Sequence, residues 1–182
     1  MIRDKLCAGT ALGRRIADSR DRLYRVALAW CGDEMLADDL VQETIETGIL
    51  KSRQLKDENR LYSWLYRILK NAWYASLRKN KGHETLDEEL LADEAGPFSN
   101  CQQLEIVVQV RQAIGRLPAE QRQVISLVDL DGLPYCEVAE ALEIPIGTVM
   151  SRLHRARKGL LGKMTTAPSG AMTANRILHL VE

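Results

Sequence analysis

Apolar side chains recur at three- and four-residue intervals through most of this chain, and this period constrains the fold more than any other feature. The first such stripe consists of Ile16, Leu23, Ala27 and Trp30. Charged residues lie largely on the other side of the same segment, as on a helix with one buried face. Leu, Ala, Arg, Glu and Gln are frequent and favour helices, whereas aromatic residues make up only 5% of the chain. We therefore predict an all-α protein.

The formal net charge is zero, but the charges are unevenly distributed. Segments 61–81 and 145–163 carry Lys and Arg without an acid, and segment 84–105 carries carboxylates without one Lys or Arg. Two basic segments fit polyanion binding, and an acidic stretch of low hydrophobicity predicts an extended, mobile tether. The predicted parts are two small helical domains at 10–81 and 104–163, a flexible acidic linker at 82–103 and a C-terminal tail at 164–182.

In the first domain, Gly32 and Asp33 interrupt the helical period, and Asp33 can cap the helix that follows. One side of that helix is formed by Leu36, Leu40, Thr44 and Gly48. A glycine inside a helix costs about 1 kcal/mol relative to Ala. A further helix is predicted from about Leu61 to Lys79, after a polar stretch that is too charged to be core.

The helix from Leu61 is predicted to have one apolar and one basic face. Its inward residues are Leu61, Trp64, Leu65, Ile68, Ala72 and Ala75. Its opposite side carries Arg67, Lys70, Asn71, Tyr74 and Arg78. Cations hold phosphates, while aromatic and amide side chains stack on and hydrogen-bond to exposed bases, so this face suits a strand whose bases are partly unpaired. Trp64 is expected in the core, because tryptophans in such a pattern are more often packing residues.

The segment from Tyr135 to Leu161 has the layout of a helix-turn-helix, with a tight turn that contains Pro145 and Gly147. The predicted inner positions are Val138, Ala139 and Leu142 on the short helix and Val149, Leu153, Ala156 and Leu160 on the final one. The opposite face of the final helix carries Met150, Ser151, His154, Arg155 and Lys158. A recognition helix reads base edges and grips phosphates with flanking cations, so we favour DNA binding over an ordinary hairpin with a solvated basic face.

The four cysteines show no C-x-x-C spacing, which predicts neither a disulfide framework nor a metal site. Cys7, Cys31 and Cys136 lie in helix-like patterns and are expected to be small core fillers in a reducing cytosol. No signal-peptide pattern and no run of about 20 apolar residues is present. We expect a cytoplasmic protein without membrane insertion and without a cofactor.

Three strings resemble the extracytoplasmic-function (ECF) sigma factors of RNA polymerase. They are DDLVQETI at 38–45, LYSWLYRILKN at 61–71 and LPAEQRQVISL…GLPYCEVAEALEIPIGTVMSRLHRARKGL at 117–160. In that family the first block is region 2 and the last is region 4, with no region 3 between them. The resemblance implies an alternative sigma factor that binds core RNA polymerase and directs promoter-specific transcription initiation in a stress or signal response. It also implies control by an anti-sigma factor.

The family's roles can be carried onto matching positions of this chain. The surface that docks on the polymerase β′ clamp helices corresponds to Asp38, Asp39, Leu40, Val41, Gln42 and Glu43, and the β flap is the second polymerase partner implied. The element that melts and reads the −10 promoter element corresponds to the loop at about 53–60 and to Arg67, Lys70, Asn71, Tyr74 and Arg78. The −35 reader includes Thr148 and corresponds to Met150, Ser151, His154 and Arg155 at the bases, with Arg152, Arg157 and Lys158 near phosphates. Many relatives have a basic or polar residue in place of Met150 and an aromatic residue in place of His154.

Three other classes of function remain open at this point. A helix-turn-helix regulator that binds operator DNA without polymerase explains residues 117–161 but leaves 36–81 without a role, and such proteins usually dimerise. A helical interaction module that mimics a sigma factor does not need the basic face of the final helix. An enzyme is the weakest reading, because the three histidines show no nucleophile–base or metal-ligand spacing.

Overall fold

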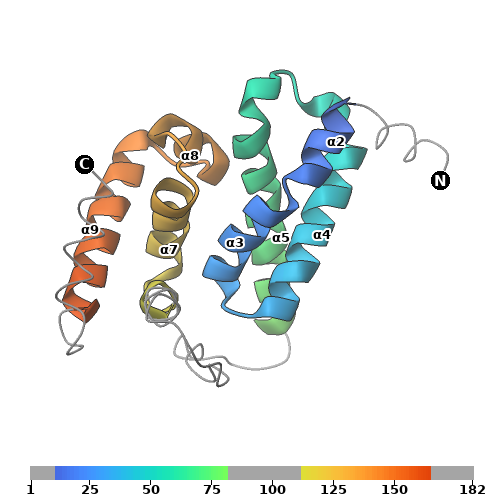
Figure 1. Cartoon of the computed structure of the whole chain (residues 1–182). Helices are drawn as coiled ribbons and strands as arrows, with labels where there is room; N and C mark the ends of the chain where they lie inside the picture. Colours follow the sequence, from blue (N-terminus) through green and yellow to red (C-terminus); the bar gives the residue numbers. More distant parts are fainter. Residues whose placement is uncertain (1–10, 82–111, 165–182) are drawn as a thin grey trace, which may run out of the picture.

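The computed structural model describes residues 11–81 and 112–164, and the regular structure in these two ranges is entirely helical. The first range contains α2 (Ala11–Asp18), α3 (Arg20–Cys31), α4 (Glu34–Leu50), the short 3₁₀ turns η1 (Ser52–Gln54) and η2 (Glu58–Arg60), and α5 (Leu61–Lys81). The second contains a helical turn at 112–115, α7 (Ala119–Ile125), the π-helical η3 (Ser126–Leu130), α8 (Tyr135–Leu142) and α9 (Ile146–Met164). The predicted all-α class with two small helical domains is confirmed (Figure 1). The expected tether, the tail and Cys7 lie outside the described residues.

Helices α2 to α5 pack around one apolar core. The predicted stripe of Ile16, Leu23, Ala27 and Trp30 is fully buried, although Ser19 divides it between two helices. The predicted cap is confirmed, because a carboxylate oxygen of Asp33 accepts the backbone N–H of Leu36 at 2.7 Å. Gly32 ends α3 with φ 73°, a left-handed conformation that glycine adopts without steric cost.

Gly48 lies where α4 crosses the helices that pack on it. A Cβ atom at this position would stand 3.0 Å from Leu65 Cδ2 and 3.2 Å from Ile16 Cγ2. The glycine therefore allows close approach of α4 to α5 and α2. This close packing offsets the lower helix propensity of glycine at this position.

On α5, most of the predicted inward residues are buried, and Trp64 is 7% exposed as expected. Two predictions for this helix are wrong. Ala75 is exposed rather than inward. Lys70, expected on an open basic face, is only 8% exposed because the second domain packs over it.

In the second domain, the buried residues of α8 and α9 include Val138, Leu142, Val149, Leu153 and Ala156, and α9 packs against both α7 and α8. The predicted Ala139 and Leu160 are half-buried, and Ala141 is a core residue that the pattern had not indicated. The expected core role of Cys136 is wrong, since it is exposed, whereas Cys31 is buried.

The turn of the helix-turn-helix differs from the predicted one. Gly147 lies inside the first turn of α9, and the residue in the left-handed conformation is Glu143, with φ 57° and ψ 45°. Pro118 stands at the N-cap position of α7, directly before the first residue of that helix.

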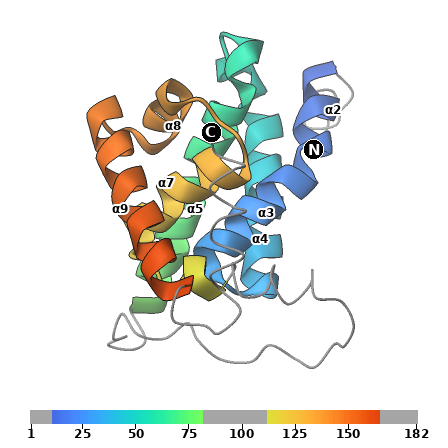
Figure 2. The ribbon, with the colours of Figure 1, turned by 60° about the vertical axis from the view of Figure 1, so that its left-hand side comes forward.

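The two domains pack directly against each other. Helix α8 lies along α5, and α7 with η3 lies against α3 (Figure 2). At the centre of this contact, the indole N–H of Trp30 donates to Ser126 Oγ at 2.7 Å, and Arg122 Nη1 donates to the Trp30 carbonyl oxygen at 2.7 Å. Buried apolar residues of both domains form one continuous cluster.

Within residues 11–81 and 112–164, no helix combines the length and apolar character needed to cross a membrane. The same residues contain no cluster of three or more His, Cys, Asp or Glu side chains that could hold a metal ion.

Candidate nucleic-acid interface

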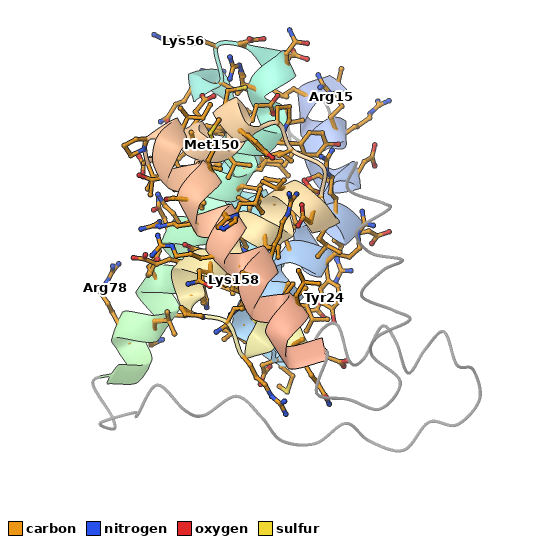
Figure 3. The ribbon with its side chains drawn as sticks, turned by 90° about the vertical axis from the view of Figure 1, so that its left-hand side faces the viewer. Arg15, Tyr24, Lys56, Arg78, Met150 and Lys158 are labelled. Carbon is orange, nitrogen blue, oxygen red and sulfur yellow. The ribbon has the colours of Figure 1, made fainter. Side chains whose placement is uncertain are left out.

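Helix α9 presents the residues predicted to meet DNA on one open face. Its inner face is held by α7 and α8, so the period of the helix turns the opposite side to solvent. The exposed residues on that side are Met150, Ser151, His154, Arg155 and Lys158. Met150 and Lys158 lie along the outer side of α9 in Figure 3, and Met150 is 50% exposed. The predicted face is thus available as a surface.

The cations of α9 differ in their partners. Arg152 Nη2 lies 2.7 Å from Glu120 Oε2, and Arg157 bonds Asp129 through both Nε and Nη2, at 3.1 and 2.6 Å. The hydrogen bond that Arg157 donates to Asp129 raises the pKa of Arg157 despite partial burial. In contrast, Arg155 Nε donates to the Ser151 carbonyl oxygen of the same helix, a partner without charge. Arg155 therefore keeps an uncompensated charge on the outer face, whereas the charges of Arg152 and Arg157 are compensated by ion pairs.

The basic side of α5 is partly covered by the second domain. Asn71 and Arg78 are exposed, and Arg67 and Tyr74 are half-buried. Lys70 Nζ lies 2.5 Å from Glu143 Oε2 and donates to the Leu142 carbonyl oxygen at 3.2 Å. These contacts place the end of α8 directly over the middle of this side of α5.

A cleft of about 440 Å³ runs beside this contact, between the two domains. Lys70, Asn71, Tyr74 and Arg78 of α5 form one wall. The other wall consists of Glu120, Gln123, Leu142, Ile144 and Arg152. Tyr74 Oη and Gln123 Oε1 are 3.4 Å apart across the cleft. Four of the five residues predicted for the −10 element thus line one concave surface.

Two carboxylates of the second domain pair with cations of the first. Glu143 meets Lys70, and Glu140 Oε2 accepts from Arg60 Nη1 at 2.8 Å. The hydrogen bond and charge of Lys70, with a further contribution from Arg67, hold the pKa of Glu143 below its usual range. The cations on this side of α5 therefore stabilise the ionised carboxylate of Glu143 in the second domain.

A third ionic contact joins the domains at the end of η3. Arg22 Nε donates to Asp131 Oδ1 at 2.6 Å, and the Asp131 side chain is 2% exposed. Burial alone would lower the pKa of Arg22, but the hydrogen bond to Asp131 and the charge of that residue outweigh burial, so the pKa of Arg22 is raised. Burial, with the charge of Asp131, also raises the pKa of Tyr66. The guanidinium of Arg22 additionally stacks 3.6 Å from the centre of the Tyr62 ring.

The residues predicted to dock on polymerase divide between core and surface. Leu40 and Val41 are buried, so they hold α4 in place rather than present a side chain to a partner. The exposed members are Asp38, Asp39, Gln42 and Glu43. Asp38 accepts from Arg20 at 2.8 Å, and both line a cleft of about 400 Å³ with Gln42.

The residues that join the two domains were missed by the sequence-based predictions. They include Arg22, Arg60, Arg122, Ser126, Asp131, Glu140 and Glu143. One signal was visible in the sequence: Glu137, Glu140 and Glu143 recur at three-residue steps and give α8 an acidic edge. The partners of that edge lie 73 and 80 residues away, so no local pattern connects them.

Comparison with known proteins identifies both blocks. A model of sigma-70 region 2 matches residues 16–83, and a model of sigma-70 region 4 matches residues 108–160. The ECF RNA polymerase sigma factor SigW of Bacillus subtilis is 31% identical over 153 residues, which cover 78% of this chain and 82% of SigW. The ECF sigma factor SigM of Mycobacterium tuberculosis is 32% identical over 148 residues, which cover 80% of this chain and 74% of SigM.

Two solved structures share the fold. The sigma factor RpoE of Bartonella quintana, in complex with the anti-sigma factor NepR, matches with a TM-score of 0.71 and 25% identity, covering 85% of this chain and 96% of RpoE. CnrH, in complex with the cytosolic domain of CnrY, matches with a TM-score of 0.62 and 26% identity, covering 87% of this chain and 92% of CnrH. With the helix-turn-helix and the basic face of α9, these matches show that the chain belongs to the ECF RNA polymerase sigma factors, a family of transcription initiation factors.

Proposed function

We propose that this protein is a cytoplasmic alternative sigma factor, without enzymatic activity, that joins core RNA polymerase and selects promoters with two separate DNA-binding faces. The domain at 10–81 would act as region 2 and the domain at 104–163 as region 4. The observation that carries the proposal is the open face of α9, where Met150, Ser151, His154 and Arg155 stand outward from a helix held by its buried side.

The outer face of α9 would enter the major groove at the −35 element. Side chains near the start of the helix would meet base edges, and Arg155 and Lys158 would supply charge to bases or phosphates. Thr148 lies half-buried in the first turn, near where the helix would meet the DNA. The ion pairs of Arg152 and Arg157 favour a positioning role for these two cations over a primary role in gripping phosphates.

The cleft-lining face of α5 would hold the non-template strand of the −10 element once the duplex opens. Asn71 and Arg67 offer an amide and a cation on adjacent turns, and Tyr74 offers a ring for stacking. On α4, Asp39, Gln42 and Glu43 would meet the polymerase β′ clamp helices, and region 4 would meet the β flap. The complexes of RpoE with NepR and of CnrH with CnrY support a further proposal, that an anti-sigma protein binds this chain.

Run-off transcription tests the proposal. Core polymerase is supplied with the region upstream of the native gene as template, with and without this protein. Specific transcripts that appear only when the protein is added are the expected result. Specific duplex binding by the protein alone, without any stimulation of transcription, would instead favour an operator-binding regulator.

A further inference from the structure

We infer that the first two turns of α9 select a thymine, because Ile146 and Met150 form an apolar contact for its 5-methyl group in the major groove. These two side chains are called the apolar pair below. The inference rests on the proposed DNA-binding role of α9 and adds which base that face prefers. It does not depend on polymerase binding, so it can fail separately from the proposed sigma function.

The apolar pair is exposed although both side chains are large and hydrophobic. Ile146 is 46% exposed and Met150 is 50% exposed. The two residues are four positions apart on α9, so they lie on the same side of the helix, one turn apart. The core of the domain takes Val149 and Leu153 from the same helix and leaves the apolar pair outside. A partner that removes this surface from water therefore gains free energy.

The neighbouring row of α9 indicates the kind of partner that fits the apolar pair. Ser151, Arg155 and Lys158 are exposed on the outer side of the helix, and the whole helix carries no acidic residue. The hydrogen bond from Arg155 Nε to the Ser151 carbonyl oxygen holds the guanidinium on this side. The major groove places anionic phosphates beside base edges, and the thymine methyl is the apolar group among those edges. A basic row beside an apolar pair therefore complements a groove that contains thymine.

Gly147 indicates that the partner approaches the backbone closely at this end of α9. A Cβ atom at this position would meet no heavy atom within 4 Å. No contact within the described part of the chain therefore requires glycine here, although glycine has a low helix propensity. A ligand that comes close to the backbone does require it, because a side chain would occupy the same space. Gly147 and the apolar pair thus mark the same two turns as the point of closest approach.

The test uses the full chain, because the outer face of α9 is open in it (Figure 3). Random-sequence duplexes are selected at low salt, where phosphate contacts strengthen binding. Each thymine of the selected sequence is then replaced by uracil, which removes the 5-methyl group and keeps every hydrogen-bonding atom. Affinities are compared for the wild type, for Met150→Ala and for the matched control Met35→Ala, which makes the same truncation at an 82% exposed position of α4.

We expect uracil at one position to lower the affinity of the wild type and of Met35→Ala about fourfold, the value for one methyl group removed from an apolar contact. The same replacement should have a smaller effect on Met150→Ala, because one of the two side chains that cover the methyl group is missing. An equal loss in all three proteins would overturn the inference. The absence of any uracil-sensitive position, or of any enriched sequence, would also overturn it.

Gly147→Ala provides a second variant, in which binding and stability should change in opposite directions. Alanine favours the helix and should raise the resistance of the chain to denaturant. Its Cβ atom enters the space of the ligand and should lower the affinity for the selected duplex about fivefold. Unchanged or tighter binding would overturn the close approach that the methyl contact needs. Run-off transcription reports on the proposed function separately, since a chain that selects thymine without stimulating transcription loses the sigma role and keeps this inference.

Discussion

The two helices that carry the proposed DNA-binding faces, α9 and α5, have similar chemistry but different surroundings. Each has an apolar side in a core and a side rich in cations. The outer side of α9 is open from Met150 to Lys158, whereas the equivalent side of α5 is covered by α8, which buries Lys70 to 8% exposure. The difference teaches that a basic helical face is a potential binding surface only, and that the packing of the other domain decides whether a ligand can reach it.

The largest expected effect concerns the open face. Arg155→Ala should lower promoter-directed transcription about tenfold, because the lost contact to a base or phosphate is worth about 1–3 kcal/mol. Arg157→Ala is the matched control on the same helix, since its charge is held by Asp129. The control should mainly lower stability, with a smaller effect on run-off transcription. Equal loss of transcription from two folded variants would show that the face has been assigned wrongly.

The next effect concerns the ionic contact between the domains. Asp131→Ala leaves the half-buried charge of Arg22 without its carboxylate, and should lower the free energy of unfolding by about 2 kcal/mol. Denaturant unfolding monitored by circular dichroism measures the change. Asp129→Ala breaks a more exposed pair within the second domain and should cost about 1 kcal/mol or less. Lys70 should react faster with an amine-acylating reagent in the Asp131 variant alone. Equal rates in both variants would show that the Arg22–Asp131 pair does not hold the second domain over α5.

A smaller effect separates the backbone of Glu143 from its side chain. Glu143→Gly and Glu143→Ala both remove the ion pair with Lys70, but only glycine relieves the left-handed conformation. The Gly variant should be more stable to denaturant than the Ala variant by about 1 kcal/mol. Both should bind a single-stranded oligonucleotide more tightly than the wild type. Equal stability of the two variants would show that residue 143 leaves the left-handed conformation once the Glu143 side chain is removed.

The smallest effect is a dependence on pH. Because Lys70 lowers the pKa of Glu143, the stabilisation that this ion pair contributes is fully present above the ordinary Glu value of about 4.3 and is lost as pH falls through the lowered pKa. The effect is small, since the Glu143 side chain is 58% exposed and solvent screens the pair. We expect the free energy of unfolding, measured by denaturant titration at each pH, to fall modestly as the pH is lowered below about 4. An equal fall in a Glu143→Gln chain would assign the effect to other groups.

Much of the fold could be predicted from local sequence because helices are local structures. The stripe from Ile16 to Trp30 and most of the inner residues of α8 and α9 follow from spacings of three and four residues, and they are confirmed. The cap at Asp33 follows from the residue type at a break in that period and is also confirmed. The outer face of α9 followed from the same period. The errors at Ala75, Cys136 and Gly147 lie at places where a neighbouring element, rather than the period, decides burial or turn conformation.

The sequence by itself determined the helical class, the two blocks, the family resemblance and which residues share each basic face, since these depend on residues a few positions apart. Only the tertiary structure decided that Lys70 is covered while Arg155 is open, that Glu143 takes the left-handed turn, and that Trp30 bonds to Ser126. The physical reason is the separation of the interacting residues along the chain. The contacts between the domains, Arg22 with Asp131 and Trp30 with Ser126 among them, join residues up to 109 positions apart. They depend on the docking of two domains, and the local sequence pattern of either domain does not indicate the other.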